Sequence, residues 1–243
     1  MSNLHTEDVW NTIVTLECEL ESISYQPAIE FLHLVDQIFS TYISTSQVSK
    51  LRNNEIVIKD THPYLQEVWN NCLAIKELTD GAFDPWAVPG GFDPSGYVKG
   101  WAADQIADQL SELGAKHIQI NAGGDISVRG GKDANTAWKI GVVHPNQSNQ
   151  VSKIYEIAKG AIATSGTAER GNHIIDPLSK TIAVGARSAT VTGPDAGMAD
   201  ALATALIVSG RDGASWFSKE ALLQYSCWVV DRHTDTTWEI LRK

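Results

Sequence analysis

The segment between residues 117 and 191 constrains the fold most, because it divides into short apolar runs separated by glycines and turn residues. Candidate strands lie at 117–121, 125–129, 137–143, 153–157, 161–164, 173–175 and 188–191. Closely spaced strands with short connections are typical of antiparallel pairing, since parallel neighbours need a crossover of about a dozen residues or more. The segment therefore predicts an antiparallel sheet.

Apolar residues at helical spacing predict helices on both sides of this segment. Helices are expected at 27–43, 63–78, 98–113, 195–208 and 214–223, and further strands at 12–17, 55–59, 226–231 and 237–241. These elements mix without the regular strand–helix–strand order of a doubly wound fold, so we expect the α+β class. No linker or short-period repeat is evident, and we expect residues 1–243 to form a single domain.

The charge balance limits the classes of partner that the chain is expected to bind. The chain has 243 residues, 19 Lys+Arg and 29 Asp+Glu, for a formal net charge of −10. A nucleic-acid-binding surface needs a basic stripe to neutralise phosphates, so this class of partner is not expected. A phosphate-bearing substrate would need something other than the net charge of the chain to hold it.

The start of the chain has no basic region, apolar region or lipobox cysteine, and no apolar run is long enough to span a membrane. The three cysteines are widely spaced and form no CxxC pair, which indicates free thiols in a reducing compartment. We therefore expect a cytoplasmic protein. The standard P-loop, dinucleotide, zinc-protease and nucleophile-elbow motifs are absent from the sequence.

The predicted helix at 195–208 carries Asp200 and Thr204 among small apolar residues. Their i, i+4 spacing places both oxygen-bearing side chains on one helix face. A carboxylate in such surroundings is costly unless it is paired or bound to a cation, and Mg²⁺ binds carboxylates together with substrate phosphates. The alternative is that Asp200 favours the N-terminal half of the helix and that Thr204 bonds back to a helix carbonyl.

Three further segments are candidates, each with a plain structural alternative. The glycine-containing stretch 121–125 allows close approach of a ligand, but it also suits a tight hairpin. The hydroxyl-rich stretch 164–171 suits phosphate binding or an exposed polar turn. His173, three residues before Asp176, is either a general base or a structural histidine.

Taken in order, six segments resemble the ApbE family, the FAD:protein FMN transferases. They are residues 81–85, 93–104, 121–125, 163–166, 173–177 and 199–205, and residues 40–42 and 46–51 are similar to the early part of the family pattern. Each motif is short, but six in the same order form a specific pattern that covers most of the chain after residue 39.

The resemblance implies an α+β fold related to a duplicated T-fold, with FAD in a cleft between the two halves. An enzyme of this kind cleaves the FAD pyrophosphate, releases AMP and leaves FMN in a phosphoester bond to a Ser or Thr of an acceptor flavoprotein. Some relatives instead hydrolyse FAD to FMN and AMP, or only hold FAD.

The resemblance also implies roles for individual residues. Asp200 and Thr204 would bind Mg²⁺ through side-chain oxygens and Gly96 through its backbone carbonyl, while His173 would be the base for the acceptor hydroxyl. The residues expected to line the FAD site are Lys99, Asp104, Gly123, Gly124, Asp125, Thr164, Ser165 and Gly166, with Glu169 and Arg170 as additions.

Two departures from the family pattern concern the flavin. Many relatives carry Met-Gly-Thr near the first strand, where this chain has Trp10-Asn11-Thr12. We expect the Trp10 ring to offer a stacking surface for the isoalloxazine. The stretch 86–92 is shorter than in long family members, so we expect a more open rim of the cleft.

Overall fold

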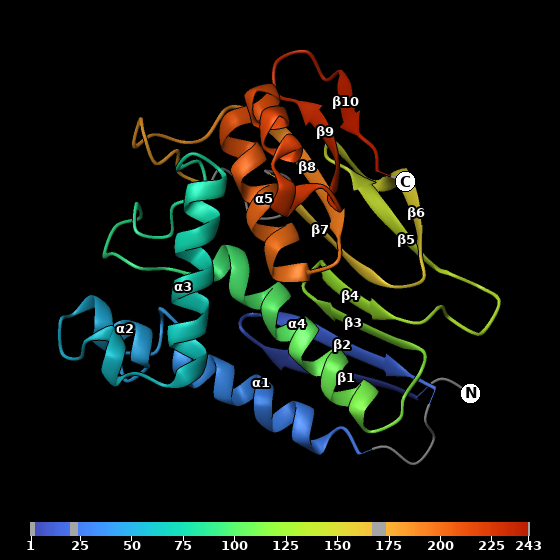
Figure 1. Cartoon of the computed structure of the whole chain (residues 1–243), viewed down its shortest axis with the longest axis horizontal. Coiled ribbons are helices and arrows are strands. Elements are labelled where there is room, and N and C mark those ends of the chain that lie inside the picture. Colours follow the sequence, from blue (N-terminus) through green and yellow to red (C-terminus); the bar gives the residue numbers. More distant parts are fainter. Residues whose placement is uncertain (1–2, 20–23, 167–173, 243) are drawn as a thin grey trace.

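The computed structural model describes residues 3–19, 24–166 and 174–242. Eight strands in these ranges form one sheet in the order β1-β2-β3-β4-β7-β8-β9-β10, and all neighbours are antiparallel (Figure 1). The strands are β1 (Asn3–Val9), β2 (Thr12–Cys18), β3 (Ile118–Ala122), β4 (Asp125–Arg129), β7 (Gly160–Gly166), β8 (Ala186–Gly193), β9 (Ser226–Asp231) and β10 (Thr237–Ile240). The predicted antiparallel sheet is confirmed.

The sheet consists of two halves with the same order of elements. In the first half the hairpin β1–β2 is followed, after an insertion that contains three further α-helices, by helix α4 (Ser95–Glu112) and the hairpin β3–β4. In the second half the hairpin β7–β8 is followed by helix α5 (Ala196–Ser209) and the hairpin β9–β10. Strands β4 and β7 pair where the halves meet, so the α+β prediction with duplicated halves agrees with the structure.

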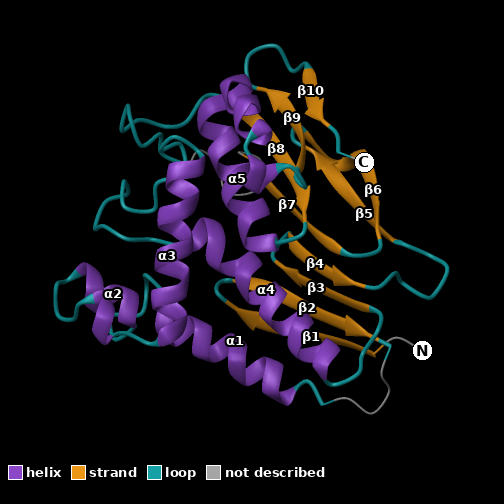
Figure 2. Ribbon diagram, in the orientation of Figure 1, coloured by secondary structure: helices purple, strands orange, loops and turns teal. Residues whose placement is uncertain are grey.

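The helices gather on one side of the sheet (Figure 2). These are α1 (Gln26–Phe39), α3 (Pro63–Leu78), α4 and α5, with the short α2 (Gln47–Arg52) farther out. Apolar residues of α1 and α4 pack with β2 and β3, and those of α3 and α5 pack with β7, β8 and β9, so each half has its own hydrophobic layer. Of the helices that the structure describes, none is both long and apolar enough to cross a membrane.

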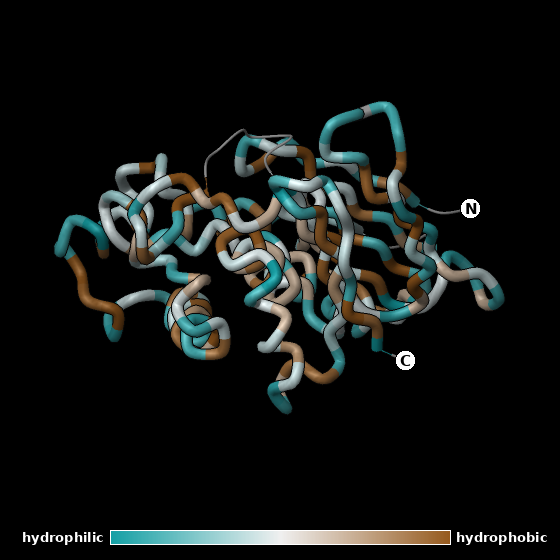
Figure 3. Tube along the Cα trace, turned by 90° about the horizontal axis from the view of Figure 1, so that it is seen from above, coloured by the Kyte–Doolittle hydropathy of each residue, from teal (hydrophilic) through white to brown (hydrophobic). Residues whose placement is uncertain are grey.

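Part of the opposite face of the sheet, over β4 and β7, is covered by a separate hairpin of β5 (Trp138–His144) and β6 (Gln147–Ile157). Its buried residues Trp138 and Ile140 pack with Ile126 and Val128 of β4. Because side chains alternate along a strand, the other residues of β4 point toward the helices. Seen from above, polar residues gather in the outer loops and apolar residues follow the packed elements (Figure 3).

Helices α4 and α5 approach each other through two glycines. A Cβ atom on Gly100 would lie 2.3 Å from the carbonyl oxygen of Ala196, and one on Gly197 would lie 2.8 Å from the ring of Tyr97. No larger residue fits at these positions without a shift of the backbone. The close approach brings polar side chains of the two helices within bonding distance of each other.

The strand predicted at 55–59 is wrong. The N–H of Glu55 donates to the carbonyl oxygen of Lys50, so this segment closes the end of α2 and continues into a 3₁₀ turn at Ile58–Asp60. The backbone hydrogen bonds that a strand would need are therefore used locally. Helix α2 and strand β1 are present in the structure but were not predicted from the sequence.

Two further elements differ from the prediction. The strand expected at 173–175 is wrong for its described part, where Ile175 makes only an isolated bridge to Ile182. The short helix expected at 214–223 is replaced by the 3₁₀ helices Gly210–Ser218 and Glu220–Leu222. The tighter turns there are compatible with the same apolar spacing, which explains why the pattern alone did not distinguish them.

Candidate active site

Lys99, Asp125 and Asp200 form a buried charged cluster where α4, β4 and α5 meet. The ammonium of Lys99 bonds to the carboxylate of Asp125 and lies 3.2 Å from Oδ2 of Asp200. The lysine side chain is 14% exposed, and both carboxylates are buried. The fold thus brings three of the predicted site residues into direct contact from distant parts of the sequence.

The cluster has more acceptor capacity than the protein fills. Within the described ranges, Lys99 is the only donor to Asp125 and Asp200 from outside the acidic pair, and a side-chain hydrogen bond joins the two acids themselves, although each carboxyl group has about four lone-pair sites. Burial, followed by the charge of Asp200, raises the pKa of Asp125 well above its ordinary value. Burial lowers the pKa of Lys99, but the two carboxylates outweigh burial and keep the pKa above its usual value.

Thr204 and Ser165 extend the cluster along the same face of α5. Thr204 lies one helical turn beyond Asp200, and its Oγ1 is 3.0 Å from Oγ of Ser165 on β7. A Cβ atom on Gly96 would lie 3.3 Å from the Thr204 hydroxyl, so the Gly96 backbone is directly beside it. Gly96 also has a non-helical conformation (φ −85°, ψ 19°) inside α4.

These residues fit a hard divalent cation. Among the described residues, no group of three His, Cys, Asp or Glu side chains could hold a metal ion. A cation at Asp200 would therefore have to take further ligands from hydroxyl, backbone and substrate oxygens, which is the ligand set that Mg²⁺ uses with phosphates. The Thr204 hydroxyl and the Gly96 backbone supply oxygens of this kind.

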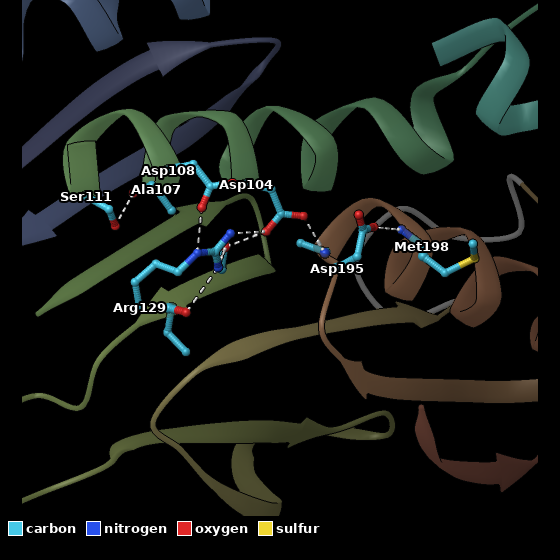
Figure 4. A network of polar contacts seen from close by, with 10 residues as sticks. Asp104, Ala107, Asp108, Ser111, Arg129, Asp195 and Met198 are labelled. Carbon is cyan, nitrogen blue, oxygen red and sulfur yellow. Dashed lines mark hydrogen bonds and ion pairs between the residues drawn. The ribbon is translucent and has the colours of Figure 1, made fainter. Parts of the chain in front are cut away.

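Asp104 lies apart from the cluster, on the next turns of α4. Its Oδ2 accepts the N–H of Ala196 at 2.6 Å, and its Oδ1 accepts the hydroxyl of Ser127 at 2.6 Å and Nη2 of Arg129 at 3.3 Å (Figure 4). Burial, followed by the charge of Asp195, raises the pKa of Asp104 to about 6. The structure thus does not bring Asp104 to the other predicted FAD-site residues.

Ser127 and Arg129 were not among the predicted site residues. A signal for them exists in β4, because Asp125, Ser127 and Arg129 alternate with the apolar residues Ile126 and Val128. In a strand whose apolar residues face one side, the polar set must face the other side, here the helices. The alternation therefore marks an interior polar face rather than a solvent-exposed one.

Gly123 and Gly124 form the two-residue turn between β3 and β4, with φ of +66° and +102°. The turn is held by Asn121, whose Oδ1 accepts the N–H of Gly124 at 2.8 Å. A Cβ on Gly123 would lie 2.7 Å from the hydroxyl oxygen of Thr12, so the glycine lets the first hairpin approach. This is the tight hairpin that the sequence allowed, and it ends directly at Asp125.

The predicted segment around residue 165 is divided between the two faces of the sheet. Ser165 points toward α5, whereas the neighbouring Thr164 is exposed on the opposite face, where its hydroxyl lies 2.9 Å from that of Thr190. Gly166 ends β7. The structure therefore joins Ser165 to the cluster and leaves Thr164 away from it, as strand alternation requires.

His173, Glu169 and Arg170 lie outside the described residues. Trp10 and Asn11 form the turn between β1 and β2, both with positive φ (58° and 54°). The Trp10 ring is partly buried between the hydrophobic layers of the two halves, and its Nε1 is buried without a hydrogen-bond partner in the described structure. A flavin-stacking role for Trp10 stays a prediction.

Comparison with known proteins identifies the family. The sequence pattern of the ApbE family matches residues 10–90 and 87–227, which include the cluster and both hairpin turns described above. The chain belongs to the ApbE family. Its fold agrees with this: it is similar to the flavin transferase ApbE from Vibrio cholerae (TM-score 0.84, 21% identity, 99% of this chain and 96% of that chain). It is also similar to the ApbE protein of Thermotoga maritima (TM-score 0.85, 24% identity, 98% and 96% coverage).

Curated relatives of this ApbE-family chain match over a shorter segment. The FAD:protein FMN transferase of Vibrio cholerae is 34% identical over 130 residues, covering 49% of this chain and 39% of the relative. The FAD:protein FMN transferase of Escherichia coli is 30% identical over 132 residues, covering 50% and 38%. The match thus spans about two fifths of the length of these relatives.

Proposed function

We propose that this ApbE-family chain is a Mg²⁺-dependent FAD:protein FMN transferase. The observation that carries the proposal is the buried Lys99–Asp125–Asp200 cluster, beside the Thr204 hydroxyl and close to where the two halves of the sheet meet. Its unfilled acceptor capacity favours a cation, and a cation in turn favours a pyrophosphate. The names of the curated relatives support the same activity.

In this proposal, Asp200, Thr204 and the backbone carbonyl of Gly96 hold Mg²⁺, which when bound neutralises charge on the pyrophosphate and on the departing AMP. Lys99 orients the two carboxylates and supplies positive charge next to the phosphates. Asp125 keeps the Lys99 ammonium in place, because their bond joins α4 to β4.

The reaction exchanges a phosphoanhydride bond for a phosphoester bond at the same phosphorus. The hydroxyl oxygen of an acceptor Ser or Thr bonds to the FMN phosphorus, the bond from this phosphorus to the bridging oxygen breaks, and AMP leaves with that oxygen. His173 is proposed to take the hydroxyl proton. The three cysteines are free and buried, which suits a reducing compartment, and we propose a cytoplasmic acceptor flavoprotein.

The proposal is tested by incubating the chain with FAD, Mg²⁺ and candidate acceptor flavoproteins. We expect AMP release together with flavin that stays on the denatured acceptor, and we expect chelation of the metal by EDTA to abolish both. A His173→Ala variant should still bind FAD but lose transfer. The matched control is His144→Ala, in the β5–β6 hairpin away from the cluster.

The products distinguish the neighbouring activities. Free FMN and AMP without labelled acceptor would indicate a pyrophosphatase, in which water replaces the acceptor hydroxyl. FAD that is bound but intact after long incubation with Mg²⁺ would indicate a flavin-holding protein. Either result with every acceptor offered would contradict the transferase proposal.

A further inference from the structure

The Asp104 carboxylate joins the three elements that carry the charged cluster. It belongs to α4, bonds to the backbone N–H of Ala196 at the start of α5, and bonds to Ser127 on β4. The cluster residues Lys99 and Asp200 lie on the same two helices. Asp104 thus connects α4, β4 and α5, the same three elements that the cluster connects through Lys99.

Asp104 is fixed on all sides by donors. Arg129 bonds to Asp104 through Nη2, to the Ser127 hydroxyl through Nη1 at 2.8 Å, and to Asp108 through Nε at 2.8 Å (Figure 4). Because Ser127 accepts from Arg129, its own proton points to the Asp104 carboxylate. Bonds from a guanidinium and a buried hydroxyl to a carboxylate are charge-assisted and hold its orientation firmly.

The bond from Ala196 sets the beginning of α5. The first N–H groups of a helix have no partner within the helix, and here two carboxylates supply acceptors. Asp104 accepts the N–H of Ala196, and the N-cap residue Asp195 accepts the N–H of Met198 at 2.5 Å (Figure 4). Asp200 follows Ala196 by one helical turn, so a shift at Ala196 moves the Asp200 carboxylate as well.

The bond between Asp104 and Ala196 lies next to the close contact of α4 and α5 at Gly100 and helps to set how the two helices are placed. At Gly100 the two helices touch through backbone atoms, and one residue further along α5 the Tyr97 ring packs against Gly197. Lys99 and Asp200 bond on one side of the crossing, and Asp104 and Ala196 bond on the other. The two polar contacts, one on each side of the backbone contact at Gly100, therefore help to define the position of the helices relative to each other.

We propose that Asp104 is a positioning residue, whose carboxylate sets the place of Asp200 relative to Lys99 and thereby the affinity of the site for Mg²⁺. The inference rests on the proposed function in that it takes Asp200 as a Mg²⁺ ligand. It differs from the expectation that Asp104 lines the FAD site, because it assigns Asp104 a role through its bond to the start of α5.

The test is a titration of the full chain with Mg²⁺ alone, in which NMR chemical shifts of the α5 amides report Mg²⁺ binding. Loss of a group that orients a metal ligand typically weakens metal binding about 10- to 100-fold. We expect Asp104→Asn to weaken Mg²⁺ binding by about this factor, because an amide N–H₂ must face one of three donors. The matched control is Asp108→Asn, at the 61% exposed outer end of the same network, which should change binding less than about twofold.

A double-mutant cycle separates positioning from general damage. In the Asp200→Asn background, the change Asp104→Asn should add less than about a twofold effect, since the ligand that it positions is gone. Equal effects with and without Asp200 would overturn the inference. So would an Asp104→Asn protein that binds Mg²⁺ as the wild type does, or a wild type whose α5 amides do not respond to Mg²⁺.

Ser127→Ala keeps the test decisive if Asp104→Asn does not fold. It removes one of the three donors to the same carboxylate, and we expect about a two- to fivefold loss of Mg²⁺ affinity; unchanged affinity would overturn the inference. The readout does not depend on catalysis. A wild type that binds Mg²⁺ but transfers no FMN would refute the proposed function alone, and the titration would still decide the role of Asp104.

Discussion

The two buried carboxylate networks on α4, β4 and α5 differ in how completely the protein fills them. In the Asp104 network both carboxylate oxygens meet protein donors from a helix start, a hydroxyl and a guanidinium. In the cluster, one ammonium serves both Asp125 and Asp200. Saturated buried acids stabilise an arrangement, whereas unsaturated ones have capacity left for a ligand. The difference favours a structural role for the Asp104 network and agrees with the proposed ligand-binding role of the cluster.

The largest effect on stability is expected at the ammonium of the cluster. Lys99→Met leaves two buried carboxylates without a compensating charge, which typically costs about 3–5 kcal/mol. Mg²⁺ should recover part of this loss if, as proposed, it binds to Asp200 in the folded state. Urea denaturation with and without Mg²⁺ measures both effects.

The control for this change is Lys76→Met in α3, whose ion pair with Asp84 is partly exposed at 2.9 Å. Such pairs contribute at most about 1 kcal/mol, so the free energy of unfolding should change little and should not respond to Mg²⁺. If Lys99→Met lowered the free energy of unfolding no more than Lys76→Met, the two carboxylates of the cluster would not depend on the Lys99 charge, and the contrast between the two networks would be wrong.

A smaller effect distinguishes the Asp104 network by pH. Burial raises the pKa of Asp104 from its ordinary value of 3.8 to about 6, so the folded protein binds this proton more tightly than the unfolded chain. Stability from this carboxyl is therefore largest below about pH 4 and decreases as the pH rises to about 6, by on the order of 3 kcal/mol. Asp104→Asn lacks this titration.

Urea denaturation of both proteins between pH 4 and 7 measures this difference. The free energy of unfolding of the wild type minus that of Asp104→Asn should fall as the pH rises through this window. A difference that stays constant, or that grows with pH, would show that Asp104 is ionised throughout and that its partners outweigh the cost of burial.

The smallest expected effect on stability concerns Gly100, where α4 and α5 are in contact between the two networks. Gly100→Ala would place a methyl group 2.3 Å from the Ala196 carbonyl oxygen, and overpacking of this kind costs about 1–3 kcal/mol. Since Ala196 carries the bond to Asp104, Mg²⁺ binding should weaken together with stability. Thermal unfolding and the Mg²⁺ titration measure the two.

The control for the crossing is Glu112→Ala, at an exposed position of the same helix. Surface changes of this kind are usually within about 0.5 kcal/mol. A Gly100→Ala protein as stable as this control would mean that α4 and α5 can move apart at no cost, and the positional link between the networks would be lost.

Local patterns in the sequence were sufficient for most of the fold. The alternation in β4 and the helical spacing in α3 and α5 predicted these elements within a few residues, because each buries an apolar face at a regular period. Strand β1 was missed because its turn, Trp10-Asn11, holds two non-glycine residues at positive φ. Such a turn lacks the usual glycine signal.

The site was predictable only as far as its motifs extend. Asp200 and Thr204 share one helix face by spacing alone, but their contacts with Lys99 and Ser165 depend on long-range packing. Asp104 shows the limit, since it belongs to the same motif as Lys99 and yet bonds to a different network. Proximity in sequence on a helix does not determine which neighbouring element a side chain meets.

The central claim is that the unsaturated cluster binds Mg²⁺ and thereby supports FMN transfer from FAD. Its most direct test is the rate of AMP release and acceptor labelling by the wild type and by Asp200→Asn, each over a range of Mg²⁺ concentrations. We predict Mg²⁺-dependent release and labelling by the wild type, and a loss of about 10²–10³-fold in a folded Asp200→Asn protein. An Asp200→Asn protein that labels the acceptor at the rate of the wild type, with the same Mg²⁺ dependence, would contradict the claim.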